Sequence, residues 1–210
     1  MPDKLSDIVS QLPFKSSFGF NHIEPISEDA LVHLQHHEVE ELHAFANERR
    51  KREYLSSRIL IKQLASEWSE PGDEFEILKD ALGRPYGMHQ SDRYFVSIAH
   101  TGNKVFCGIS PEAAIGVDAE PVDRLIHERL KRRIVHPGET DELLSLETIR
   151  LWTIKEAFIK LEGQGLRLNM NQVEVRVSEP DFFVEINNDK RAKICSFQYK
   201  DHWLAIAYYQ

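Results

Sequence analysis

Three carboxylates in two short stretches of the sequence could bind one metal ion. The stretch Ile115–Glu120 alternates apolar residues with Asp118 and Glu120. As a β-strand it would place both carboxylates on one face, with Cα atoms roughly 7 Å apart. The stretch 151–161 has the periodicity of an amphipathic helix and supplies Glu156. Such an all-oxygen site suits Mg²⁺, which usually keeps waters and a phosphate among its ligands.

Two lysines on the expected helix suit a phosphate. Lys155 and Lys160 flank Glu156, and lysines bind phosphates as point charges. The apolar stripe that faces the core consists of Leu151, Ile154, Phe158 and Leu161. Glu156 and Lys160 point nearly opposite that stripe, with Trp152 and Ile159 beside them, so we expect a semi-enclosed cleft. The alternative is a surface ion pair at i,i+4 spacing, worth about 0.2–0.5 kcal/mol.

Other patterns carry less chemistry. His33 and His37 have a spacing that can bind a transition metal, but the cluster 33–43 lacks a His-Glu-x-x-His motif, and exposed helix residues are the simpler interpretation. The sequence has no Walker A loop, no Gly-x-Gly-x-x-Gly and no Ser-His-Asp or Cys-His nucleophile pattern. A nucleotide would therefore be held by side chains, and the nucleophile would arrive on a partner.

The composition predicts a cytoplasmic protein with a sizeable core. The 210 residues are 41% hydrophobic, without a run long enough to cross a membrane and without a signal-peptide pattern at the N-terminus. The two cysteines lie in apolar contexts and are expected to be reduced. A net charge of −8 argues against nucleic-acid binding.

The two halves of the sequence share one layout. A helix pattern runs over about 47–68 and another over about 146–162, and each is followed by a hairpin pattern, 94–109 and 192–208. We therefore predict an α+β protein with two similar subdomains, residues 1–111 and 112–210. Each would be an antiparallel sheet packed on a long helix, related to the other by a pseudo-two-fold axis.

Basic residues form two clusters despite the acidic total. Residues 49–52 with Arg58 make the first, and the segment 124–133, which includes Arg124, Arg129 and Arg132, makes the second. The first could bind a polyanionic cofactor and the second an acidic protein partner. The alternative for each is a solvated helix face.

The carboxylate stretches together resemble the paired signatures of the 4′-phosphopantetheinyl transferases. Gly-Val-Asp-Ala-Glu at 116–120 is followed by Trp-Thr-Ile-Lys-Glu-Ala-Phe-Ile-Lys at 152–160, with Glu156 placed 36 positions after Glu120 (156 − 120). The segments 97–101 and 82–86 are similar to two further family segments. Ala99, Thr101 and Ala119 depart from the family pattern, and Ala99 lacks a hydroxyl group.

The resemblance implies an activity. The enzyme, a holo-carrier-protein synthase, would move 4′-phosphopantetheine from coenzyme A to a serine of an apo acyl or peptidyl carrier protein. The reaction would need Mg²⁺ and would release adenosine 3′,5′-bisphosphate, and the protein would be monomeric. The alternatives are a catalytically weak module that binds coenzyme A or a carrier, and a Mg²⁺-dependent phosphohydrolase. The carrier, its pathway and the acyl selectivity stay open.

The resemblance also implies site residues. Asp118, Glu120 and Glu156 would bind Mg²⁺, and Glu156 would be the catalytic base, with Lys155 and Lys160 as catalytic lysines at the phosphates. The residues implied for coenzyme A are Arg52, Arg58, Arg84, His100, Thr101, Lys155 and Lys160. The choice of arginines between Arg49 and Arg58 stays open.

Overall fold

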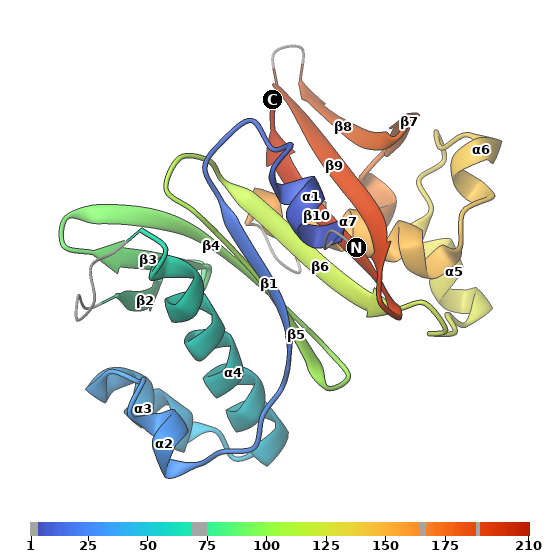
Figure 1. The fold of residues 1–210 in the computed structure, drawn as a ribbon. Coiled ribbons are helices and arrows are strands. Elements are labelled where there is room, and N and C mark those ends of the chain that lie inside the picture. The colour runs from blue at the N-terminus through green and yellow to red at the C-terminus, as the bar shows by residue number, and fades with distance from the viewer. Residues whose placement is uncertain (1–3, 69–74, 164–166, 188–189) are drawn as a thin grey trace.

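Two five-stranded antiparallel sheets, each with one long helix, make up the protein (Figure 1). The structure is a computed structural model that describes residues 4–68, 75–163, 167–187 and 190–210. The first half contains β1 (Ser17–His22), α4 (Glu48–Ala65), β2 (Glu76–Lys79), β3 (Pro85–His89), β4 (Asp92–Thr101) and β5 (Lys104–Ser110). The second contains β6 (Ile115–Pro121), α7 (Thr148–Glu162), β7 (Arg176–Ser178), β8 (Asp181–Asn187), β9 (Lys190–Tyr199) and β10 (His202–Tyr209).

The two halves have the same topology. The strand orders are β1-β5-β4-β3-β2 and β6-β10-β9-β8-β7, so in each sheet the first strand lies at an edge beside the fifth. The long helix follows that first strand in both halves. The two hairpins expected over 94–109 and 192–208 are present as β4–β5 and β9–β10. The predicted α+β class with two similar subdomains is confirmed.

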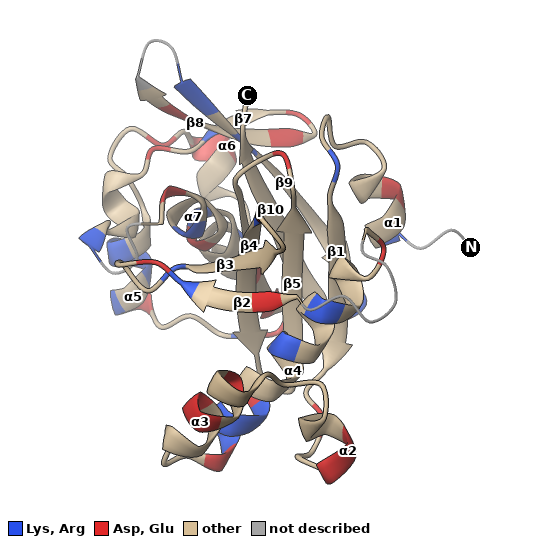
Figure 2. Ribbon diagram, turned by 90° about the vertical axis from the view of Figure 1, so that its left-hand side faces the viewer, with Lys and Arg blue, Asp and Glu red and all other residues tan. Residues whose placement is uncertain are grey.

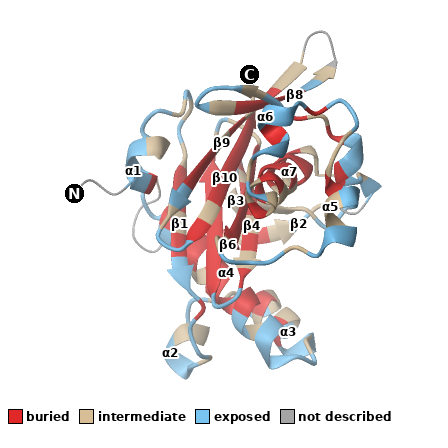
Figure 3. Cartoon of the chain, turned by 90° about the vertical axis from the view of Figure 1, so that its right-hand side faces the viewer, coloured by how far each residue is buried: buried red, intermediate tan, exposed pale blue. Residues whose placement is uncertain are grey.

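Short helices fill the connection between the first strand and the long helix of each half. They are α2 (Glu28–Leu31) and α3 (His36–Ala44) in the first half, and α5 (Glu128–Ile134) and α6 (Asp141–Leu144) in the second. Figure 3 shows much of α5 and α6 exposed and α7 mostly buried. A 3₁₀ turn, η2 (Met170–Gln172), follows α7. Among the described residues, no helix is both long and apolar enough to cross a membrane.

One hydrophobic core joins the halves. Phe18, Phe20 and Phe106 of the first sheet pack in the same buried cluster as Leu204 and Ile206 of the second. The helix α1 (Lys4–Val9) adds Leu5 to this cluster, and the Phe14 ring lies 5.1 Å from the ring of Tyr208. Residues 4–16 thus pack against both halves, and the predicted division at residues 111 and 112 stays a prediction.

The close approach of α7 to β6 requires a glycine at position 116. A Cβ atom there would lie 2.0 Å from the carbonyl oxygen of Ala157 and 2.5 Å from the backbone nitrogen of Leu161. In the first half, Gly19 on β1 faces α4 in the same way. A Cβ atom there would meet only the Leu60 side chain, at 2.7 Å. The approach is therefore limited by backbone in the second half and by a movable side chain in the first.

This difference makes Gly116→Ala the more damaging of two matched substitutions. Because overpacking against immobile backbone forces the helix away from the sheet, we expect a loss of about 3 kcal/mol or more for Gly116→Ala and about 1 kcal/mol for Gly19→Ala. Thermal unfolding of the two variants measures this order. Equal losses would show that the β6–α7 contact can yield as readily as the β1–α4 contact.

Candidate active site

The three carboxylates predicted as metal ligands meet between β6 and α7. Asp118 and Glu120 lie opposite Ala205 and Trp203 of β10 in the sheet register, and both are buried, with 6% and 9% of their surface exposed. Glu156 comes from α7, which packs against β6. The charges of Glu120 and Glu156 both act on the pKa of Asp118. Strand alternation and the packing of α7 thus place the three carboxylates near one another, and their role as metal ligands stays a prediction.

Basic and hydroxyl side chains pair with part of this cluster. The Lys160 ammonium lies 2.8 Å from Asp118 Oδ1. The Arg124 guanidinium pairs with Glu120 Oε1, and the Thr101 hydroxyl donates to Glu120 Oε2 at 3.3 Å. Asp118 Oδ2 is buried without a hydrogen-bond partner. The cluster therefore retains an unsatisfied buried carboxylate oxygen.

The electrostatics of the cluster favour an added cation. Burial, helped by the charges of Glu120 and Glu156, raises the pKa of Asp118 to about 7 against the attraction of Lys160. The pKa of Glu156 is also raised, first by burial, against the attraction of Lys160. No three His, Cys, Asp or Glu side chains in the described ranges are already arranged around an ion position. The orphaned oxygen and the hard oxygen donors nevertheless fit a divalent cation.

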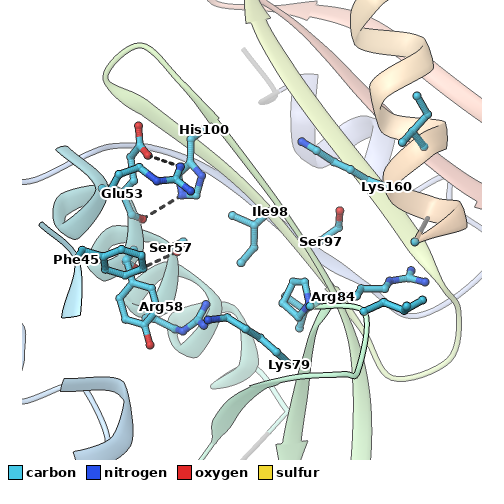
Figure 4. A pocket seen from close by; sticks show the side chains of 18 residues that line it. Phe45, Glu53, Ser57, Arg58, Lys79, Arg84, Ser97, Ile98, His100 and Lys160 are labelled. Atoms are coloured by element: carbon cyan, nitrogen blue, oxygen red, sulfur yellow. Dashed lines mark hydrogen bonds and ion pairs between the residues drawn. The ribbon is translucent and has the colours of Figure 1, made fainter. Parts of the chain in front are cut away.

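A cavity of about 440 Å³ lies beside the carboxylates, between α4, β4 and the end of α7 (Figure 4). Its lining residues are Phe45, Arg50, Glu53, Tyr54, Ser57, Arg58, Lys79, Leu82, Gly83, Arg84, Pro85, Val96, Ser97, Ile98, His100, Ile159, Lys160 and Gly163. Five of these are lysines or arginines, and Glu53 is the one carboxylate among them. A cavity with this lining suits a polyanionic ligand with apolar parts.

Lys160 belongs to both the cavity and the carboxylate cluster. It reaches from α7 toward the cavity, while Arg58 and Phe45 lie on the other side (Figure 4). The same ammonium group contacts Asp118. A single ligand could therefore contact the basic cavity and the carboxylates at once.

The first half supplies the other groups predicted for the cofactor. Arg58 is buried, 3% exposed, with its guanidinium 4.4 Å from the centre of the Tyr54 ring. His100 Nε2 donates to the backbone carbonyl of Glu53 at 3.0 Å, and burial lowers the pKa of His100. Arg84 lies in a turn in which Asp80 Oδ1 accepts its backbone N–H at 2.9 Å. All three side chains line the cavity, and their contact with coenzyme A stays a prediction.

Lys155 lies elsewhere, which corrects its predicted role. It is fully buried, and its ammonium group lies 2.5 Å from Glu139 Oε1 and donates to the carbonyls of Ile134 and Met170 at 2.6 and 3.2 Å. Burial lowers its pKa, against the attraction of Glu139. Neighbouring residues on a helix point about 100° apart, so Lys155 faces the core on the side of α5 and η2. It fastens these elements to α7 and does not reach the cavity.

Two further predicted contacts also differ from the structure. Arg52 Nη2 and Nε donate to the carbonyls of Ile23 and Glu24 at 3.1 and 3.3 Å, and Arg52 does not line the cavity. Thr101 is buried, and its hydroxyl donates a hydrogen bond to Glu120. We therefore assign Thr101 to the carboxylate cluster and not to cofactor contact.

Sequence reasoning left the choice of Arg50 open and missed Glu53, Tyr54 and Ser57. All four residues line the cavity together with Arg58. They follow the i, i+3, i+4, i+7, i+8 spacing of one helix face, which was a usable signal. Lys79 gave no such signal, because β2 brings it to the cavity from a distant part of the sequence.

Lysine substitutions should separate these structural and cavity roles. Lys155→Met leaves Glu139 buried without its partner, so we expect a loss of about 3–5 kcal/mol in unfolding free energy. Lys160→Met also removes the partner of a buried carboxylate, but the pKa of Asp118 is raised to about 7, so Asp118 can take up a proton and the loss should be smaller than for Lys155→Met. Urea unfolding measures both values. A smaller loss for Lys155→Met than for Lys160→Met would contradict the assignment.

The raised pKa of Asp118 predicts how stability depends on pH. The pKa rises from 3.8, its ordinary value, to about 7 in the folded protein, so stability falls as pH rises through this window. Without divalent metal, Asp118→Asn should therefore raise Tm at pH 8 by about 2–4 °C, the shift that ~1 kcal/mol gives at this size. The gain should be smaller at pH 5 and should vanish only below about pH 3.8, where Asp118 is protonated in the unfolded state as well. A gain that is the same at both pH values would contradict the buried, uncompensated charge.

Comparison with known proteins agrees with this geometry. Residues 114–207 match the sequence model of the 4′-phosphopantetheinyl transferase superfamily. The chain is 30% identical over 139 residues to the 4′-phosphopantetheinyl transferase psf-1 of Bacillus pumilus, covering 61% of this chain and 57% of that protein. It is 26% identical over 133 residues to the 4′-phosphopantetheinyl transferase Sfp of Bacillus subtilis, covering 60% and 58%.

A mouse protein is similar over a longer stretch. The L-aminoadipate-semialdehyde dehydrogenase-phosphopantetheinyl transferase of Mus musculus is 25% identical over 168 residues, which is 71% of this chain and 54% of that protein. The chain spans about half the length of the curated relatives it matches. The matched region contains β6, α7 and all three carboxylates, so the part of the chain that carries the carboxylate cluster is similar in sequence to the 4′-phosphopantetheinyl transferase superfamily.

Proposed function

We propose that this chain transfers 4′-phosphopantetheine from coenzyme A to a serine of an apo acyl or peptidyl carrier protein, with Mg²⁺, and releases adenosine 3′,5′-bisphosphate. The observation that carries the proposal is the position of Lys160, which lines the basic cavity and contacts Asp118. A nucleotide with phosphates at two positions could fill the cavity and present its pyrophosphate to the carboxylates.

The cavity would hold the nucleotide part of coenzyme A. Arg58, Arg84 and His100 converge on it from α4, the β2–β3 turn and β4. The two arginines suit the 3′-phosphate and the pyrophosphate, because charge-assisted hydrogen bonds to phosphate are the strong ones, and His100 lines the cavity beside them. Lys160 would contact the pyrophosphate, since it lies at the end of the cavity nearest the carboxylates.

Asp118, Glu120 and Glu156 would hold the Mg²⁺ ion. When bound, the ion would neutralise charge on the pyrophosphate and on the leaving adenosine bisphosphate. Lys160 already offsets part of the charge of Asp118, and Arg124 part of that of Glu120. These residues thus keep the carboxylates together before a ligand binds.

Glu156 is the best candidate for the base that accepts the serine proton. The serine oxygen would form a bond to the β-phosphorus of coenzyme A, and the bond from that phosphorus to the oxygen bridging to the α-phosphate would break. Glu156 stands on a buried helix, and its pKa is raised by burial and by Glu120. A carboxylate with a raised pKa is a better proton acceptor near neutral pH.

The segment 124–133 would dock the carrier. Arg129 and Arg132 are exposed on α5, where Lys and Arg gather (Figure 2). Leu125 is 95% exposed and offers an apolar contact beside them. Acidic residues on a carrier would be attracted there, although the whole protein is acidic.

The proposal is tested by incubating the protein with coenzyme A, Mg²⁺ and a panel of apo-carriers, with intact mass as the readout. We expect one phosphopantetheine on at least one carrier, and none with Glu156→Gln. Binding of coenzyme A without transfer would favour a non-catalytic binding module. Turnover of coenzyme A without a carrier would favour a phosphohydrolase.

Reversing two arginines on α5 tests the docking surface. Arg129→Glu with Arg132→Glu should raise the KM for the carrier about tenfold and weaken its salt dependence, because charges at the edge of an interface act mainly on encounter. The KM for coenzyme A should stay within about twofold, since α5 does not line the cavity. An equal rise in KM for both substrates would contradict docking and would favour the alternative that the segment is a solvated surface.

A further inference from the structure

A buried carboxylate in a cavity suited to anions needs an explanation. Glu53 is 4% exposed and lines the cavity among its basic residues. Neither the carboxylate cluster nor the proposed reaction uses this side chain. On charge alone, Glu53 would repel a phosphate and weaken binding.

The contacts of Glu53 show what its carboxylate holds. Oε2 accepts from Arg50 Nη1 at 3.0 Å, and Oε1 accepts from Arg49 Nε at 2.8 Å. Burial would raise the pKa of Glu53, but these two hydrogen bonds outweigh it and keep the pKa below its ordinary value. Arg50 lines the cavity and Arg49 does not. One carboxylate thus ties a cavity arginine to its neighbour on the helix.

The backbone of the same residue holds His100. The Glu53 carbonyl can only accept, so the proton of this hydrogen bond sits on His100 Nε2 (Figure 4). Residues from α4 and β4 are therefore fixed relative to each other through one position. Most of the Arg50 side chain is exposed, with 63% of its surface accessible, so without Glu53 it would be free to leave the cavity.

We propose that Glu53 is a positioning residue of the cavity, whose carboxylate holds Arg50 so that the guanidinium meets a phosphate group of the ligand in a fixed geometry, while its carbonyl fixes the His100 ring in the cavity wall. This inference rests on the proposed function in that the ligand is taken to be coenzyme A. The carboxylate strengthens anion binding by orienting a cation, and this gain exceeds its own repulsion.

Simple charge repulsion and positioning predict opposite signs for Glu53→Gln. The substitution keeps the shape and removes the charge, so repulsion alone predicts tighter binding of coenzyme A. Positioning predicts weaker binding, by about fivefold to tenfold, the scale of one charge-assisted hydrogen bond at a partly exposed site. Isothermal titration calorimetry with coenzyme A decides the sign.

A double-mutant cycle then separates positioning from a general loss of stability. Arg50→Gln should weaken binding about tenfold, and Glu53→Gln added to it should cause little further loss, because the two side chains act as one unit. Arg49→Gln is the matched control, since it removes the other partner of the same carboxylate outside the cavity, and it should change affinity less than twofold. In turnover, the KM for coenzyme A should rise in Glu53→Gln while kcat stays unchanged.

The same series is titrated with pyrophosphate, which probes the cavity without assuming coenzyme A. If the wild-type protein binds pyrophosphate but not coenzyme A, the proposed function is wrong. The double-mutant cycle measured with pyrophosphate would still test the positioning role of Glu53. Binding by Glu53→Gln that is equal to or tighter than wild type, or losses that multiply in the double variant, would overturn the positioning role. Failure of the wild type to bind either ligand would overturn both.

Discussion

The burial of negative charge between β6 and α7 is the constraint on which the rest of the site depends. Asp118 lies in a packed interface where burial favours the neutral form, yet two more carboxylates lie close enough to raise its pKa further. Such an arrangement is stable only with positive charge nearby. Lys160 provides part of that charge, and the unpartnered oxygen of Asp118 shows that part is still missing. Gly116 permits this approach of helix to strand.

The two halves use one scaffold for opposite electrostatic purposes. Both long helices follow the first strand of a sheet with the same strand order. In each half, a lysine of the long helix pairs with a buried carboxylate: Lys62 with Glu38 at 2.5 Å, and Lys160 with Asp118 at 2.8 Å. The carboxylate comes from α3 in the first half and from the sheet in the second. The helix α4 presents Arg50 and Arg58 to the cavity, whereas α7 contributes Lys160 to the cavity and Glu156 to the carboxylate cluster.

Much of this arrangement could be predicted from the sequence, because it follows from local periodicity. Strand alternation gave the shared face of Asp118 and Glu120, and helix periodicity put Glu156 and Lys160 on the side away from the core stripe. Lys155 could not be placed in this way. Its direction depends on Glu139 and on the carbonyls of Ile134 and Met170, which other elements bring to it.

Partners from distant segments also explain why Arg52 was wrongly predicted to contact the cofactor. A run of basic residues at 49–52 reveals its charge but not which member faces a cavity, and carbonyls from the segment after β1 hold Arg52. The role of the histidines between residues 33 and 43 also stays open. The structure shows His36 on α3 near Glu40, at 3.3 Å, with the pair exposed to solvent.

The central claim is that the carboxylates of the second half and the basic cavity of the first act on one ligand. It is tested most directly by electron–nuclear double resonance on Mn²⁺ bound in place of Mg²⁺, with coenzyme A present. We predict phosphorus-31 coupling from the pyrophosphate to the Mn²⁺ ion, lost in Asp118→Asn. Mn²⁺ bound without phosphorus coupling, or coupling unchanged in Asp118→Asn, would contradict a single site shared by the two halves.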